Sequence, residues 1–129
     1  VGLSIISDTS EVTVKRIKIE IIRYLDEIEK GNQVGKLSDF IADHLAKNYF
    51  SLSKLFSKNQ SKTIEAFAIE QKVNRIKQLL REDELTVSEM AYKLGYSTVQ
   101  HLSNQFRRIT GFSVSEFKND ALLEIKCLK

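Results

Sequence analysis

TVSEMAYKLGYSTVQHLSNQFRRITGFSVSEFK, residues 86–118, carries the clearest structural signals in this chain of 129 residues. Its segments 86–89 (TVSE) and 113–116 (SVSE) are both capping boxes. In such a box a hydroxyl and a carboxylate reciprocally bond the N–H groups left without partners at the start of a helix. The two boxes therefore predict helices that begin at about Val87 and Val114.

Two glycines mark the ends of helices in the same stretch. Gly95 and Gly111 lie where helices should stop, because glycine adopts positive φ without a Cβ clash. Ala91 is a small residue where two helices must approach closely, and Gly95 follows it four positions later. Leu102 and Phe106, also four apart, hold one face of the next helix to a core. This is the build of a helix-turn-helix, whose second helix can enter the DNA major groove.

The module occurs twice in the chain. Residues 51–67 match residues 101–117 at an offset of 50 positions, and residues 41–45 match 90–94. The identical residues of the longer match are Leu52 and Leu102, Ser53 and Ser103, Phe56 and Phe106, and Phe67 and Phe117. An array of stacked repeats would need at least three units. We therefore interpret the pattern as a duplicated module whose copies are separated by a spacer.

The remaining sequence also favours helices. There is no proline, and most windows carry apolar residues three and four positions apart; only the start, VGLSII at 1–6, has the pattern of a short strand. We predict an all-α fold with two helix-turn-helix (homeodomain-like) subdomains joined by a long linker helix, plus an additional N-terminal helix. The predicted division is an N-terminal extension at 1–35, a first helix-turn-helix at 36–63, a linker helix at 64–85, and a second helix-turn-helix with a C-terminal tail at 86–129.

The first half contains four predicted helices. The first runs over about 14–29 and ends before the Gly-rich break at 30–36. Its apolar stripe consists of Val14, Ile17, Ile21, Leu25 and Ile28. Two shorter helices follow Ser38 and Asn48 as N-caps. The fourth, the linker, extends over about 64–81 and would form a rod of roughly 27 Å at 1.5 Å per residue.

The length of the linker helix suits two modules on one duplex. Successive major-groove faces of B-DNA recur every ~34 Å, so the rod would bring the modules to adjacent turns. If the rod is slightly short, the DNA must bend, at a cost on the order of 1–6 kcal/mol.

Positive charge is concentrated on the first module, residues 36–63. The chain has 20 Lys and Arg against 17 Asp and Glu, a net charge of +3, and its pI is near 9.0. Residues 36–63 hold five Lys and two Asp, whereas residues 1–35 hold five basic and six acidic groups. This distribution favours an anionic partner.

The polar face of the second module's helix provides candidate base contacts. Gln100 and Asn104 are four apart and so share a helix face, where their amides can present a donor and an acceptor to adenine N6 and N7. Val99 can pack against a thymine methyl, and Ser103 can take either kind of partner. The alternative interpretation of these residues is a solvated helix surface.

Phosphate contacts and the first module complete the candidate site. Arg107 and Arg108 lie at the end of the second module's helix, where they can contact phosphate; they also suit the C-terminal helix dipole. In the first module the comparable outward positions are Phe50, Ser53 and Lys54. Lys54 can donate to guanine or to phosphate, and Phe50 can meet a thymine methyl or be packed instead.

The two quoted modules resemble the DNA-binding domain of AraC/XylS-type bacterial transcription regulators. The stretch LSKLFSKNQSKTIEAFAIEQKVNRIKQLL at 52–80 precedes A-x-x-x-G-Y-S, L-S-x-x-F-R-R and a capped F-K in residues 86–118. The likeness spans about residues 36–118. It implies seven helices and binding to asymmetric promoter sites by an activator that recruits RNA polymerase. It places the first reading helix at Phe50, Ser53 and Lys54 and the second at Val99, Gln100, Ser103 and Asn104.

The sequence departs from this family at several positions. Ala46 stands where the first turn often has glycine, Ser61 replaces the glycine after the first reading helix, and Val114 replaces a common proline. Residues 1–35 lie outside the family pattern and are similar to a Bacteroidetes-like subgroup with a small N-terminal domain, of which VGLSII would be the last strand. Because Val1 is not a start methionine, we expect a longer protein with an N-terminal sensor or dimerisation domain.

Other classes of function have little support. His44 and His101 are isolated, and the sequence has no Gly-rich phosphate loop, metal-ligand spacing or nucleophile with a base partner, so we expect no enzyme, cofactor or metal site. The lone Cys127 excludes a disulfide within the chain and favours a reducing compartment. Without an apolar span or signal peptide, we expect a cytoplasmic bacterial protein that joins the nucleoid when bound to DNA.

One alternative function remains open at this point. The helix-turn-helix units can serve as the scaffold of a helical protein-protein interaction module without specific DNA binding. The apolar stripe of residues 14–29 would then pair with another chain rather than pack in the core.

Overall fold

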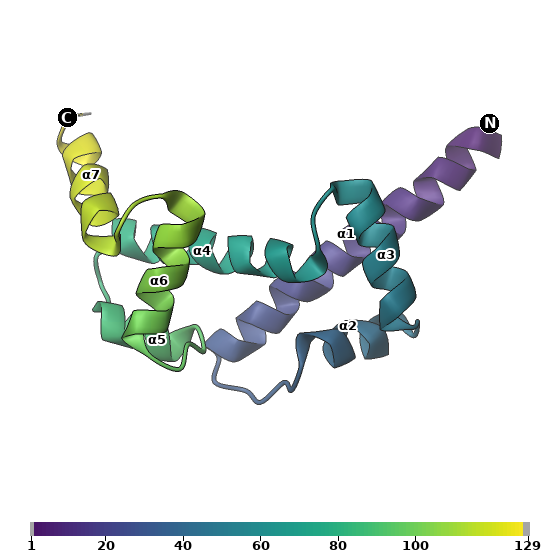
Figure 1. Cartoon of the computed structure of the whole chain (residues 1–129), viewed down its shortest axis with the longest axis horizontal. Coiled ribbons are helices and arrows are strands. Elements are labelled where there is room, and N and C mark those ends of the chain that lie inside the picture. Colours follow the sequence, from purple (N-terminus) through teal and green to yellow (C-terminus); the bar gives the residue numbers. More distant parts are fainter. Residues whose placement is uncertain (1, 128–129) are drawn as a thin grey trace. The chain divides into compact units, whose positions relative to one another are not determined.

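The computed structural model describes the backbone of residues 2–127 and the side chains of residues 9–120, and every regular element of this part is an α-helix (Figure 1). The helices are α1 (Gly2–Glu29), α2 (Leu37–Leu45), α3 (Tyr49–Gln60), α4 (Ile64–Glu82), α5 (Val87–Lys93), α6 (Val99–Thr110) and α7 (Val114–Cys127). The all-α prediction is confirmed. None of the helices described is both long enough and apolar enough to cross a bilayer.

The predicted strand at 1–6 is wrong, because α1 begins at Gly2 and continues without a break to Glu29. A strand needs a partner strand for its backbone bonds, and residues 2–127 contain none. Within α1, Thr13 donates its hydroxyl hydrogen to the Thr9 carbonyl at 3.0 Å, as a β-branched hydroxyl residue does inside a helix.

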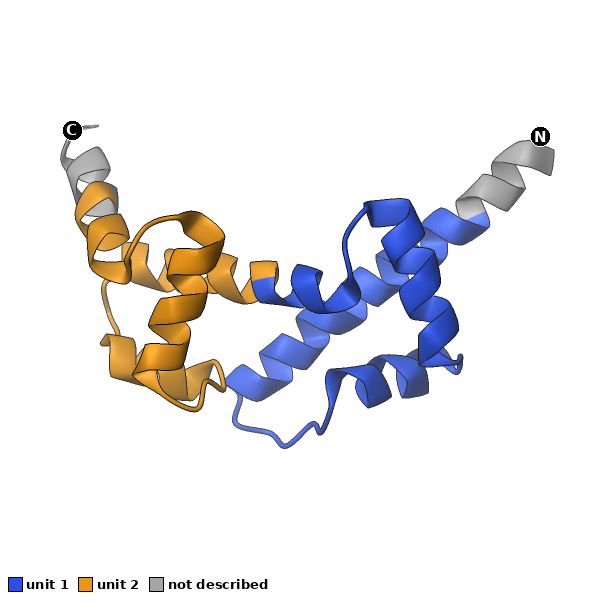
Figure 2. Cartoon of the chain, viewed as in Figure 1, with its two compact units in different colours: residues 1–69 blue, residues 70–129 orange. Residues whose placement is uncertain are grey.

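The chain forms two compact units, residues 1–69 and 70–129, whose boundary falls within α4 (Figure 2). In unit 1, α1 packs against α2 and α3, and α2 packs against α3. Its core consists of Val14, Ile17, Ile21, Ile41, Leu45, Leu52, Phe56, Ile64 and Ala68. The stripe of α1 therefore belongs to the core of its own unit, and its interpretation as a seam between chains is wrong. The predicted division into subdomains at 36–63, 64–85 and 86–129 stays a prediction.

The start of α2 differs from the prediction. Ser38 was expected as the N-cap, but α2 begins at Leu37, and Lys36 takes the cap position without a side-chain bond to the helix. Leu37 is half-buried and packs on the core of unit 1. This packing draws Leu37 into the first turn, so tertiary contact prevails over the capping preference of serine.

Unit 2 is held together by residues from α4 to α7. Its buried side chains are Val73, Ile76, Leu79, Leu80, Met90, Ala91, Leu94, Tyr96, Leu102, Phe106 and Val114. Helix α6 contacts both α5 and α7. The side chain of Cys127 lies outside the described residues.

Both predicted capping boxes form in unit 2. Glu89 accepts from the Thr86 N–H at 2.8 Å, and the Thr86 hydroxyl accepts from the Glu89 N–H at 3.1 Å. Glu116 and Ser113 make the same two bonds at 2.9 and 3.1 Å, so α7 begins at Val114 without the proline common there. These caps fix where α5 and α7 begin.

The two modules share their turn conformations. Ala46 and Ser61 adopt left-handed φ values of 53° and 60°, at the positions that correspond to Gly95 and Gly111 in the second module, with φ values of 79° and 83°. Residues with a Cβ atom therefore occupy a conformation that favours glycine, which costs roughly 1–2 kcal/mol per residue. The first module keeps the family's turn despite lacking its glycines.

The hydrogen bonds of the first turn confirm this equivalence. In each module the N–H of the turn residue bonds the carbonyl three positions back, and the next N–H bonds the carbonyl five back. These bonds join Ala46 to Asp43, Lys47 to Ala42, Gly95 to Tyr92 and Tyr96 to Ala91, at 3.4, 3.2, 3.3 and 2.9 Å. The pattern is a Schellman motif, which ends one helix and turns the chain toward the next.

Candidate nucleic-acid interface

Helix α6 presents one face to the core of unit 2 and the other to solvent. The side chain of Thr98 caps it by accepting from the His101 N–H at 3.0 Å. Leu102 and Phe106 are fully buried, and Gly111 ends the helix in the left-handed conformation. Because two side chains four residues apart fix its rotation, the opposite face of α6 must point outward.

Four of the predicted site residues lie on this outward face. Gln100, Asn104, Arg107 and Arg108 are all exposed. Gln100 donates from Nε2 to Asn104 Oδ1 at 2.8 Å, so the two amides form a pair on the helix surface. The arginines occupy the last turn of α6, which contains no acidic residue. The surface combines amide groups that can bond base edges with cations that can bond phosphate.

The other two predicted residues of α6 lie toward the edge of this face. The side chain of Val99 is 40% exposed, and Ser103 is half-buried. A hollow of about 170 Å³ lies on the surface of α6 and is lined by His101, Asn104, Gln105 and Arg108. Gln105 was not among the predicted residues, although the spacing 101, 104, 105 and 108 would have placed it on one helical stripe.

Tyr96 supports α6 from the turn that precedes it. Its buried hydroxyl donates to Gln105 Oε1 at 2.5 Å, and its ring meets His101 edge to face at 5.1 Å. Lys72 of α4 places Nζ 4.5 Å from the centroid of the same ring. Burial raises the pKa of Tyr96 to about 12 and lowers the pKa of Lys72. Like any tyrosine, Tyr96 is protonated at physiological pH, so its hydroxyl donates to α6 through Gln105.

Helix α3 repeats this construction in unit 1. The side chain of Asn48 accepts from the Ser51 N–H at 3.3 Å, which confirms Asn48 as the N-cap. Leu52 and Phe56 are buried, at the positions of Leu102 and Phe106.

The predicted site residues of α3 differ in exposure. The side chain of Phe50 is 69% exposed and that of Lys54 is exposed, whereas Ser53 is half-buried. The ammonium of Lys54 lies 5.4 Å from the centroid of the Phe50 ring, a cation-π contact.

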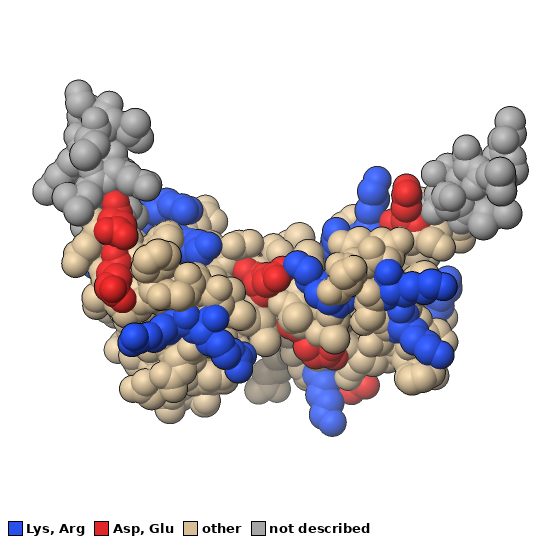
Figure 3. Space-filling view, turned by 45° about the horizontal axis from the view of Figure 1, so that its top comes forward, with Lys and Arg blue, Asp and Glu red and all other residues tan. Residues whose placement is uncertain are grey.

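The repeat adds Lys58 to the candidate surface. At the offset of 50, exposed Lys58 of α3 corresponds to Arg108 of α6, a correspondence that the sequence carries but from which Lys58 was not predicted. Neither α3 nor α6 contains an acidic residue. On the face drawn in Figure 3, Lys and Arg side chains gather in both units. Each unit therefore carries a helix that has exposed cations and no acidic residue of its own.

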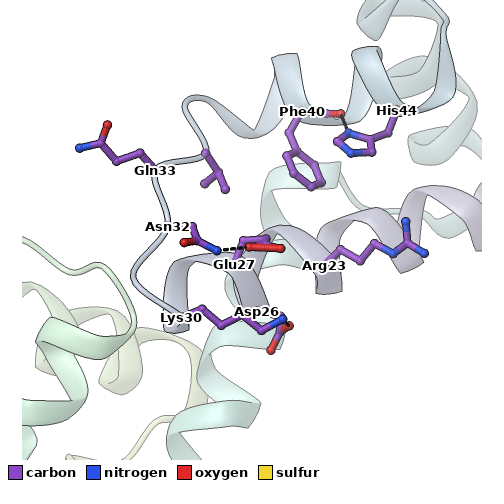
Figure 4. Close-up of a pocket in the computed structure, with 9 residues that line it drawn as sticks. Arg23, Asp26, Glu27, Lys30, Asn32, Gln33, Phe40 and His44 are labelled. Atoms are coloured by element: carbon purple, nitrogen blue, oxygen red, sulfur yellow. Dashed lines mark hydrogen bonds and ion pairs between the residues drawn. The ribbon is translucent and has the colours of Figure 1, made fainter.

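A larger hollow of about 470 Å³ lies in unit 1 between the end of α1, the following loop and α2 (Figure 4). Its polar groups bond mainly to one another. Lys30 pairs with Asp26 at 3.0 Å, a bond that raises the pKa of Lys30, and Asn32 bonds Glu27 at 2.5 Å. Nδ1 of His44 bonds the carbonyl of residue 40 at 2.8 Å. The lining includes the carboxylates of Asp26 and Glu27, whereas α3 and α6 contain no acidic residue, so the exposed faces of α3 and α6 suit an anionic partner better.

The fold and these faces define a helix-turn-helix protein. Residues 41–120, more than half of the chain, match the family model described as the helix-turn-helix domain. The chain belongs to this family and is an AraC/XylS-type DNA-binding domain of a transcription regulator.

Similar proteins include regulators from several bacteria. The xylose operon regulatory protein of Haemophilus influenzae is 27% identical over 78 residues, which are 60% of this chain and 20% of that protein. The chain therefore spans about a fifth of that relative's length. The C-terminal domain of AraT, a response regulator from Geobacillus stearothermophilus, has a TM-score of 0.72 at 18% identity and covers 84% of each chain. A DNA-binding transcriptional dual regulator from Escherichia coli K-12 has a TM-score of 0.71 at 17% identity, covering 86% of this chain and 93% of that one. These two structures show the shared fold.

Proposed function

We propose that this chain binds promoter DNA sequence-specifically, with α3 and α6 as recognition helices in adjacent major grooves. The observation that carries the proposal is the exposed, mutually bonded pair of Gln100 and Asn104 on a helix whose opposite face, Leu102 and Phe106, is fully buried. A helix held in this way presents amide donors and acceptors outward, and these are the groups that pair with base edges. Val99 and Ser103 flank the pair and add apolar and hydroxyl contacts.

In unit 1 the reading surface is formed by Phe50, Ser53 and Lys54. The exposed ring of Phe50 suits a thymine methyl, and the ammonium of Lys54 suits guanine O6 and N7. Arg107 and Arg108 bind phosphates and fix the register of α6 on the duplex. The helix between the modules, α4, has 19 residues, about 28 Å at 1.5 Å per residue. Adjacent major-groove faces lie ~34 Å apart, so the length of α4 is of the order that two modules on adjacent turns of one duplex need.

The proposed biological role rests on the similarity to a regulatory protein. The relative from Haemophilus influenzae is an operon regulatory protein, and the matching part is a fifth of its length. We assign to this chain the role of the DNA-binding part of an activator that contacts RNA polymerase. A sensor or dimerisation domain elsewhere in the protein controls it. The chain performs no catalysis, needs no cofactor, and acts in the bacterial cytoplasm, where the chromosome lies.

The test is to select bound duplexes from a random library and to compare the affinity for a selected duplex with that for its scrambled sequence. We expect a ratio of about 10³ or more at physiological salt. Gln100→Ala and Asn104→Ala should each lower this ratio about tenfold with unchanged thermal unfolding. Equal affinity for selected and scrambled duplexes would contradict the proposal. It would favour the competing function of a helical protein-protein interaction module.

A further inference from the structure

The two modules carry a coupled pair of side chains at the same register. Gln100 and Asn104 occupy positions 50 beyond Phe50 and Lys54, and in each pair the side chains contact one another across one helical turn. The contact is an amide hydrogen bond of 2.8 Å in α6 and a cation-π contact of 5.4 Å in α3. The two contacts differ in chemistry. In both modules, however, two exposed side chains four residues apart are in contact.

The bond in α6 orders the groups that the amides present. Each carboxamide has one oxygen acceptor and two N–H donors. Gln100 donates one of its two amide hydrogens to Asn104 Oδ1, so Nε2 of Gln100 faces Asn104 and Oε1 points away from it. Gln100 keeps Oε1 and one N–H, while Asn104 keeps both N–H groups. If the bonded hydrogen is the one that points away from Oε1, Oε1 and the remaining N–H share one edge of Gln100 and present one acceptor and one donor in a fixed order.

This order matches adenine among the four bases. In the major groove adenine offers the N7 acceptor beside the N6 donor, whereas guanine offers two acceptors, N7 and O6. An acceptor and a donor held in fixed order fit adenine and place Oε1 against O6 in guanine. We propose that Gln100 and Asn104 act as one unit that selects a single A·T base pair, an inference that rests on the proposed function.

The pair has two distinguishable parts. Gln100 makes the contact with adenine, and Asn104 is a positioning residue that holds the Gln100 amide in its order. Removing either one therefore removes the same discrimination. Two independent readers would instead discriminate at two base pairs, and their losses would multiply.

The experiment is a double-mutant cycle on a duplex selected by the parent chain. Gln100→Ala, Asn104→Ala and the double variant are titrated with that duplex and with versions changed at each base pair in turn. We expect both single variants to lose about tenfold preference at one and the same A·T pair. The preference of the double variant at that pair should be at most about threefold lower than that of the less selective single variant. Two independent contacts would instead lower the preference about a hundredfold relative to the parent.

A base analogue tests the atoms involved. Replacing the adenine of that pair by 7-deazaadenine removes the N7 acceptor and leaves N6 in place. The parent should lose about tenfold affinity for the duplex with this analogue. The Gln100→Ala variant should bind the analogue duplex and the adenine duplex with equal affinity. A loss of equal size in both proteins would show that Gln100 does not bond N7, and would overturn the assignment.

Lys54 supplies the matched control, because it belongs to the other unit and to the other pair. The losses of Lys54→Ala and Asn104→Ala should multiply in the combined variant, because the two residues belong to different compact units and to different side-chain pairs. All substituted side chains are exposed, so unchanged thermal unfolding of each variant shows that the fold is intact.

The outcomes separate the two proposals. If the parent binds selected and scrambled duplexes equally, the proposed function fails. If the parent discriminates but the Gln100 and Asn104 losses multiply or fall at different base pairs, only the paired reading fails. Selection of a G·C pair at that position would also overturn it.

Discussion

The rings of Phe106 and Phe117 pack edge to face, with centroids 5.6 Å apart and planes at 79°. Phe56 and Phe67 repeat the arrangement in unit 1, at 5.7 Å and 71°. The repeat of the sequence at an offset of 50 is therefore also a repeat of packing. The pairs join the buried faces of α3 and α6 to the helices that follow them, α4 and α7. This packing helps to fix which face of α3 or α6 points outward.

The aromatic pair should be essential to unit 2. Phe106→Ala removes a fully buried ring and leaves a cavity, so we expect a loss of about 3–5 kcal/mol in the free energy of unfolding, measured in urea. Phe112→Ala is the matched control, because this side chain is 48% exposed and should cost well under half as much. Similar losses for the two variants would show that Phe106 does not anchor α6.

The left-handed turns predict opposite effects of glycine in the two modules. Ala46→Gly should raise the free energy of unfolding by about 1 kcal/mol because it relieves the strain at φ 53°. Gly111→Ala should lower it by a similar amount; a Cβ there meets no atom within 4 Å, so the cost is backbone strain alone. Asn74→Gly, inside α4 and exposed, is the control and should destabilise. A destabilising Ala46→Gly would contradict the account of the turn.

The capping box of α7 predicts a pH dependence. Hydrogen bonds from the backbone and side chain of Ser113 lower the pKa of Glu116 from its ordinary value of 4.5. A carboxyl whose pKa is lower in the folded state stabilises above its unfolded pKa, and this contribution is lost as pH falls through the folded value. Glu116→Gln should therefore reduce the loss of stability between about pH 5 and pH 3. Ser113→Ala should have the same effect. Parallel pH curves for parent and variants would exclude this linkage.

Local signals in the sequence predicted most helix boundaries. Asn48, Thr86 and Ser113 cap helices as expected, because each cap depends on side chains within three residues of the helix start. The start of α2 was predicted wrongly, since the packing of Leu37 on unit 1 involves residues distant in sequence. The start of α1 was missed because residues 2–13 include β-branched residues, which are common in strands.

The candidate site was predictable in outline but not in its internal contacts. Spacing alone placed Gln100 and Asn104 on one face of a helix, and the structure leaves both exposed. Their hydrogen bond depends on side-chain rotamers, which spacing does not determine. The support of α6 by Lys72 through Tyr96 was missed, because it joins residues 24 positions apart with no local pattern.

The cations of α6 predict a change in salt dependence. Arg107→Ala and Arg108→Ala should each weaken binding to all duplexes about equally and reduce the slope of log affinity against log salt by about 1. Lys58→Ala tests the equivalent position of α3 in the same way. Lys30→Ala is the control, because its ammonium pairs with Asp26 at 3.0 Å and the residue belongs to neither α3 nor α6. A slope that changes with Lys30 but not with the arginines would contradict the assignment of phosphate contacts.

The central claim is that the outward faces of α3 and α6 contact the bases, and NMR titration of the chain with a selected duplex tests it most directly. We expect the largest shifts at the side-chain amides of Gln100 and Asn104 and along α3 near Lys54. The backbone amides of the buried stripe of α1, around Ile17 and Ile21, should change little. Shifts that concentrate on α1 while the Gln100 and Asn104 amides stay unchanged would contradict the account.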